Sequence, residues 1–114
     1  MRRMEVAHEE RLARNESLFR ELNERINEVA GTLGADEHPY EFVCECSDSQ
    51  CTERLVLSRR EYDHIRAVGT RFVLAHGHVT PEIEHVVERA DDHLVIEKDG
   101  VAAEVAIKLD PRTA

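Results

Sequence analysis

Residues 42–57, Phe-Val-Cys-Glu-Cys-Ser-Asp-Ser-Gln-Cys-Thr-Glu-Arg-Leu-Val-Leu, hold all three cysteines of the 114-residue chain between two apolar segments. Residues two apart on a strand point to the same face, so Cys44 and Cys46 should lie side by side. The Ser-Asp-Ser-Gln stretch consists of turn-forming residues, which can bring Cys51 back toward them. The pattern predicts a hairpin with strands over 41–46 and 52–57 and the cysteines at its tip.

Three thiolates that converge on one point suit a tetrahedral zinc ion and leave one ligand position to be filled. His78 is our candidate for that position, because it follows Gly77 at the end of a strand expected over 71–76. His76, His38 and a water molecule remain as alternatives for the fourth ligand. The sequence therefore predicts a zinc-ribbon-like hairpin and a Cys3His site made of Cys44, Cys46, Cys51 and His78.

Disulfide bonding is the weaker interpretation of the cysteines, because any pairing leaves one of the three over. The first residues contain no apolar segment typical of a secretory signal, and no apolar run approaches membrane-spanning length. We therefore expect a reducing cytoplasm, where clustered cysteines are more often metal ligands or reactive thiols than bridges. Three buried, inert cysteines are the structural alternative.

Composition restricts the class of partner. The chain is 41% hydrophobic and 34% charged, which is typical of a folded domain with a strongly solvated surface. Its formal net charge of −9 speaks against a nucleic-acid module, because phosphate binding depends on clustered Lys and Arg. We expect neither nucleic acid nor a membrane as partner.

Residues 1–34 are predicted to form a long N-terminal helix, because Glu, Arg and Leu dominate and apolar residues recur at helical spacing. A helix of this length should overhang a core built from residues 35–114. We therefore expect its apolar stripe to form a seam with a protein partner or a second copy, with Asn15 setting the register. Packing on the chain's own sheet is the alternative. The stripe comprises Leu12, Phe19, Leu22, Ile26, Val29 and Leu33.

Residues 35–114 are predicted to form a small α+β zinc-binding unit, with one domain overall. Ser58-Arg59-Arg60-Glu61 is a capping box that starts a short helix. Residues 81–98 fit either a helix or a hairpin, and the hairpin is favoured because Ala90-Asp91-Asp92 resembles a turn between strands. A second short helix is expected over 101–109. The fold class is α+β with a small antiparallel or mixed sheet.

Several segments of the chain form a recognisable combination: residues 15–26, Phe42-Val43-Cys44-Glu45-Cys46 with Cys51, Glu61-Tyr62 with Arg66, Phe72-Val73, Gly77-His78 and Val95-Ile96-Glu97-Lys98. This combination resembles a family of small uncharacterised bacterial proteins, found mainly in actinobacteria. The resemblance extends over about residues 14–98, and its most specific part is Cys-x-Cys-x4-Cys with Gly-His. It implies His78, rather than His76, as the partner of the cysteines, and it implies no activity.

Motifs typical of enzymes are otherwise missing, since the five glycines are isolated and build no phosphate-binding loop. We therefore predict a small cytoplasmic protein with a structural zinc site that acts in protein–protein interaction or as a regulatory accessory, assembled as a homodimer. A thiol redox or metal sensor is the first alternative. A zinc-dependent hydrolase is the second, and it would require water as the fourth ligand.

Overall fold

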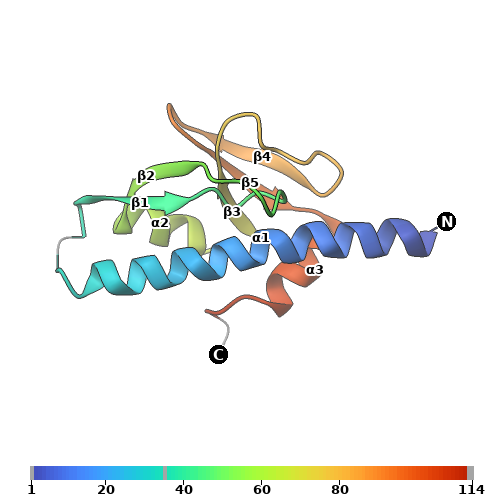
Figure 1. The fold of residues 1–114 in the computed structure, drawn as a ribbon, viewed down its shortest axis with the longest axis horizontal. Coiled ribbons are helices and arrows are strands. Elements are labelled where there is room, and N and C mark those ends of the chain that lie inside the picture. The colour runs from blue at the N-terminus through green and yellow to red at the C-terminus, as the bar shows by residue number, and fades with distance from the viewer. Residues whose placement is uncertain (1, 35, 113–114) are drawn as a thin grey trace.

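A computed structural model describes residues 2–34 and 36–112, and within these ranges the chain forms three helices and five strands (Figure 1). The helices are α1 (Arg2–Gly31), α2 (Arg59–Arg66) and α3 (Gly100–Lys108). The strands are β1 (Pro39–Val43), β2 (Arg54–Ser58), β3 (Arg71–Leu74), β4 (Glu84–Arg89) and β5 (Leu94–Lys98). The predicted α+β class and the long N-terminal helix are confirmed.

Two small sheets form the centre of the molecule. Strands β1 and β2 make an antiparallel pair, and β3, β5 and β4 make a three-stranded antiparallel sheet in that order. The β4–β5 hairpin confirms the hairpin interpretation of residues 81–98. It carries a register shift between Val86 and Glu88.

The segment after β1 connects the two sheets. The amide of Cys44 donates to the Glu53 carbonyl at 3.0 Å and so continues the pairing with the β2 side. One residue later, the amide of Glu45 donates to the Val73 carbonyl of β3 at 2.9 Å. Cys44 and Cys46 lie in this crossing segment, after the end of β1. The sequence pattern predicted a strand over 41–46 that contains both cysteines, and this part of the prediction is wrong.

Helix α2 begins where the sequence predicts. The hydroxyl of Ser58 accepts the Glu61 amide at 3.1 Å, and the Glu61 carboxylate accepts the Ser58 amide at 2.8 Å. This reciprocal capping satisfies two amides that a helix start leaves without partners. The helix places Tyr62 against Phe42 of β1, with ring centroids 4.7 Å apart and the rings stacked. These two rings lie in the main core, between α2 and both sheets.

Helix α1 runs along the whole molecule, and its N-terminal end projects beyond the other elements (Figure 1). It packs against β1, α2 and α3. The face that it buries is mostly polar: Ala13, Glu16, Ser17, Arg20, Asn23, Asn27 and Ala30. Most of the apolar stripe faces solvent, with Leu22, Val29 and Leu33 exposed and Leu12, Phe19 and Ile26 partly buried. The alternative in which the stripe packs on the chain's own sheet is therefore wrong for its exposed members.

Two buried polar side chains of α1, Arg20 and Asn23, contact different parts of the fold. The guanidinium of Arg20 donates to the carbonyls of Gly69 and Ala106, both at 2.6 Å, and lies 4.3 Å from the centroid of the Phe72 ring. One turn further on, Asn23 pairs with the backbone of Val43 as a strand would, through two hydrogen bonds of 2.8 Å. These contacts dock the helix by directed hydrogen bonds and not by apolar burial alone.

The N-terminal half of α1 is held by a buried charge cluster. The Lys98 ammonium of β5 contacts the carboxylates of Glu16 on α1 and Glu84 on β4, and all three side chains are inaccessible to solvent. The same ammonium lies 4.9 Å from the centroid of the Phe72 ring. Burial of charges is tolerated here because opposite charges are in direct contact. In the described part of the chain, no helix is long and apolar enough to cross a membrane.

Candidate metal centre

The structure brings the four predicted ligand residues together. Cys44 and Cys46 come from the segment that crosses between the sheets, Cys51 from the loop before β2, and His78 from the turn after β3. One ligand atom from each residue lies within 4.8 Å of the others. This arrangement can hold a metal ion.

The spacing of the donor atoms fits one shared ion. The Nδ1 atom of His78 lies 3.6 Å from the Sγ of Cys44 and 3.6 Å from the Sγ of Cys51. Sulfur and nitrogen ligands at about 2.3 and 2.0–2.1 Å from a tetrahedral ion are themselves about 3.6 Å apart. The two measured separations therefore match edges of a coordination tetrahedron.

Local turns aim the ligands at one another. The amide of Cys51 donates to the Asp48 carbonyl at 3.0 Å, and the Asp48 carboxylate accepts the Gln50 amide at 2.9 Å, so the loop folds back on itself. On the other side, the amide of His78 donates to the Ala75 carbonyl at 3.2 Å. The turn requires a φ of +82° at Gly77, a conformation that favours glycine and explains the Gly-His pair.

The electrostatics of the three thiols favour one thiolate at the centre of the cluster. A hydrogen bond from Cys44 lowers the pKa of Cys46 to about 5, and bonds from His78 and Cys51 assist. The pKa of Cys44 is raised because its thiol donates to Cys46 and is buried, although the Ala75 amide, at 3.2 Å from its sulfur, opposes this. Burial also raises the pKa of Cys51. A thiophilic metal would release the remaining protons on binding.

A buried carboxylate lies between the first two cysteines. Glu45 points away from the thiols and is inaccessible to solvent. Its carboxylate accepts the Tyr62 hydroxyl at 2.6 Å, the Asn23 amide group at 2.8 Å and the Val73 backbone amide at 3.0 Å. Burial raises the pKa of this carboxyl, and the three hydrogen bonds oppose the increase. Glu45 therefore connects α1, α2 and β3 directly behind the two cysteines.

Sequence reasoning missed Glu45, although the Cys-Glu-Cys alternation contained a signal. Neighbouring side chains in an extended segment point to opposite faces, so a residue between two converging cysteines must point away from them. Nothing local reveals that this opposite face is buried under α1 and α2.

The cysteine loop is also tied to α1 and to the segment before β4. The side chain of Asn15 donates to the Ser47 carbonyl at 2.9 Å, and the hydroxyls of Ser47 and Thr80 are 2.7 Å apart. The expectation that Asn15 sets the register of an intermolecular seam is wrong, since its side chain is used inside the chain. Its contact stabilises the residue next to Cys46.

The other histidines do not join the cluster. His76, an alternative for the fourth ligand, is exposed and has its Nε2 3.0 Å from the Ala90 carbonyl. His38 is exposed and lies against the Tyr40 ring. His8, His64 and His85 are exposed as well. His93, in contrast, is buried at the end of the β4–β5 hairpin.

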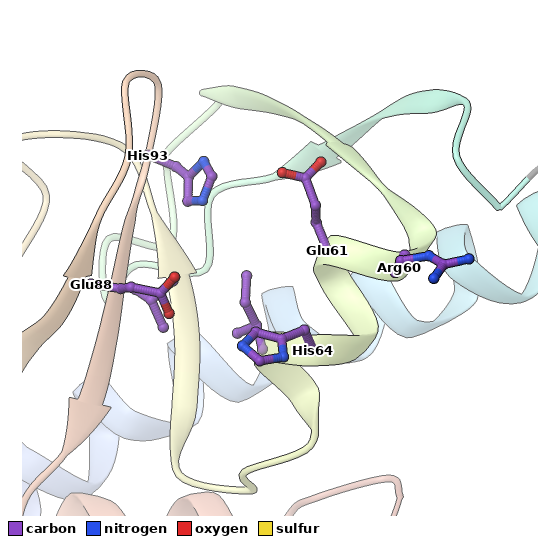
Figure 2. A pocket seen from close by; sticks show the side chains of 7 residues that line it. Arg60, Glu61, His64, Glu88 and His93 are labelled. Atoms are coloured by element: carbon purple, nitrogen blue, oxygen red, sulfur yellow. The ribbon is translucent and has the colours of Figure 1, made fainter.

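Two cavities lie next to side chains that can bind a ligand or a metal ion. A cavity of about 260 Å³ adjoins the candidate metal centre and is lined by Cys46, Ser47, Asp48, Gly77, His78 and Val79. A separate one of about 340 Å³ lies between α2 and the β4–β5 hairpin (Figure 2), lined by Arg60, Glu61, His64, Ile65, Glu88, His93 and Val95. Figure 2 shows the imidazoles and carboxylates spread around its walls. Among the described residues, the cysteine cluster is the group whose ligand atoms converge.

No protein-family model, curated protein or solved structure matches this chain. Its functional interpretation therefore depends on the geometry of the site and on the surfaces around it.

Proposed function

We propose that Cys44, Cys46, Cys51 and His78 bind one zinc ion with a structural role, in a small protein that acts through protein–protein contacts as an interaction module or regulatory accessory. The convergence of three sulfurs and one imidazole nitrogen within 4.8 Å carries the proposal. This donor set favours zinc over magnesium or calcium, because thiolates are soft ligands and the other two ions prefer oxygen.

A structural role agrees with the position of the site. The four ligands belong to the segments that follow β1, precede β2 and follow β3, outside the regular strands. A shared ion would link these loops, and the Asn15–Ser47 contact would extend the link to α1. Four protein ligands also fill a tetrahedral site and leave no position for a reactive water, which speaks against the hydrolase alternative.

Metal analysis of protein purified under reducing conditions tests the proposal. We expect about one zinc per chain, and we expect cobalt-substituted protein to show the absorption bands of tetrahedral thiolate coordination. His78→Ala should weaken zinc retention, whereas the matched variants His76→Ala and His38→Ala should retain the metal. A metal-free wild type that chelators leave unchanged in stability would show that the cluster is only a set of reduced thiols.

A thiol redox or metal sensor is the second candidate, and a specific observation favours it. The cavity of about 260 Å³ reaches Cys46 and His78, and Cys51 is only partly buried. Small oxidants could therefore reach the sulfurs. A sensor should release zinc with diamide and recover it with reductant and added zinc, whereas a structural site should release the metal only as the protein unfolds.

We also propose that the protein works in a reducing cytoplasm and belongs to the actinobacterial family that it resembles. The three cysteines are free of disulfides, which supports the first point. The positive φ of Gly77, directly before His78, gives the Gly-His part of the resemblance a structural reason.

A further inference from the structure

Helix α1 presents an unusual outer face. Leu18, Leu22, Val29 and Leu33 have exposed fractions of 65%, 44%, 67% and 67%. They lie opposite the buried polar residues of the same helix. An amphipathic helix normally buries its apolar face. Helix α1 does the reverse, because its polar side packs on the rest of the chain and its apolar side is exposed. An exposed row of large apolar side chains is typical of an interaction surface.

The row borders a hollow at the C-terminal end of α1. The hollow measures about 340 Å³ and is lined by Arg25, Ile26, Val29, Ala30, Leu33 and Tyr40. Apart from the arginine, all of these side chains are apolar or aromatic. A large aliphatic side chain from a partner would fit against it.

We propose that a second copy of this chain covers the face, with the two α1 helices packed antiparallel about a two-fold axis near residues 25 and 26. This inference rests on the proposed role as an interaction module and names its partner. The spacing of the row carries the assignment, because its apolar positions are symmetric about that midpoint. Leu22 then faces Val29 of the second copy, and Leu18 faces Leu33 and the hollow beside it. A surface that complements itself in this way is what a two-fold dimer requires.

The charges beside the row are compatible with this pairing. Arg25 and Glu28 lie beside the exposed row, and neither takes part in an ion pair within the described residues. In the antiparallel arrangement, Arg25 lies about two helix positions, roughly 3 Å along the axis, from Glu28 of the second copy. The two Arg25 side chains meet near the axis, between the Leu22–Val29 contacts, and each has a Glu28 carboxylate of the other copy within reach to offset their mutual repulsion.

The size of the contact sets the strength that we expect. Only one face of α1 on each copy takes part, so the contact belongs to the small and weak class of interfaces, and we expect a dissociation constant of about 10 µM. The dimer should dominate at about 100 µM and dissociate near 1 µM.

Native mass spectrometry and analytical ultracentrifugation of the zinc-loaded protein test the assignment. Leu18→Glu and Leu22→Glu should each give a monomer with unchanged zinc content and helicity. The control Val56→Glu alters a side chain of β2 that is 51% exposed and should leave the dimer intact. Arg25→Glu should weaken the dimer at least tenfold, and Arg25→Glu combined with Glu28→Arg should restore it.

Orientation is tested by replacing Leu22 with the photo-cross-linker p-benzoylphenylalanine. Antiparallel helices should give cross-links to the peptide around Val29, whereas parallel helices would give cross-links around Leu22 itself. A wild-type protein that is monomeric at 100 µM, or a dimer that both glutamate variants leave unchanged, overturns the inference. Zinc content is read in the same spectra, so a zinc-bound monomer refutes the dimer alone, and a zinc-free dimer refutes the zinc proposal alone.

Discussion

Replacement of Lys98 by methionine tests the buried charge cluster most directly. The chain contains two lysines, and Lys98 is the one buried between α1 and the three-stranded sheet, where it contacts the carboxylates of Glu16 and Glu84. Methionine keeps the length of the side chain and removes the charge. The variant therefore leaves two carboxylates close together in a site that is inaccessible to solvent.

The structure gives the direction and the size of the effect. Removing one partner from a buried ion pair destabilises a protein by about 3–5 kcal/mol, a large part of a typical total of about 5–15 kcal/mol. Burial lowers the pKa of the Lys98 ammonium to about 6, and the charge of Asp99 opposes this. Direct contact with the carboxylates of Glu16 and Glu84 favours the charged form further, so we expect the ammonium to be charged in the folded protein. We therefore expect Lys98→Met to lower the free energy of unfolding by about 3–5 kcal/mol at pH 8.

The loss should depend on pH in a defined direction. Burial raises the pKa of Glu84 to about 7 from an ordinary value of 4.5. Between these two values the folded state binds a proton that the unfolded state does not, so this carboxyl's contribution to stability falls as pH rises through about 7. Without the Lys98 charge the carboxyl should hold its proton more firmly, so Lys98→Met should be less damaging at pH 6.5 than at pH 8.5.

Urea unfolding of zinc-loaded protein, followed by circular dichroism, measures these differences. Lys108→Met is the matched control, because Lys108 is exposed on α3 and its replacement should change stability by less than about 0.5 kcal/mol. The triple variant Lys98→Met/Glu16→Gln/Glu84→Gln should recover much of the loss by removing both unpaired charges. Equal stability of Lys98→Met and Lys108→Met at pH 8.5 would refute the reasoning.

Three further perturbations probe other parts of the structure. Removal of zinc by a chelator should lower the melting temperature of the reduced protein, because metal binding contributes folding free energy; an unchanged calorimetric transition would contradict a structural ion. Tyr62→Phe should lower the free energy of unfolding by about 1.5–3 kcal/mol, because the buried Glu45 carboxylate loses a hydrogen-bond donor. Tyr40→Phe is the matched control at a partly buried ring, and it should leave the free energy of unfolding in urea nearly unchanged. Ser58→Ala should lower the free energy of unfolding by about 1 kcal/mol, because the Glu61 amide loses its hydrogen bond to the Ser58 hydroxyl. An unchanged thermal unfolding transition would show that the α2 cap is dispensable.

Features that depend on local spacing could be predicted from the amino-acid sequence alone. The capping box of α2 involves residues three apart, and the β4–β5 hairpin is defined by its own turn. The convergence of the three cysteines with His78 could also be anticipated, because turn-forming residues lie between Cys46 and Cys51 and a glycine precedes the histidine. Short-range geometry restricts such groups before the rest of the chain is placed.

The buried face of α1, in contrast, depends on contacts with distant parts of the chain. Helical periodicity revealed an apolar stripe, but the docked face consists of Glu16, Arg20, Asn23 and Asn27 with other small or polar residues. Their partners lie on other elements: Lys98, the carbonyls of Gly69 and Ala106, the backbone of Val43, and Asp63. A polar side chain is stable inside a protein only when a matching group meets it. Groups 20 or more positions away in the chain supply those matches, so no local pattern could reveal them.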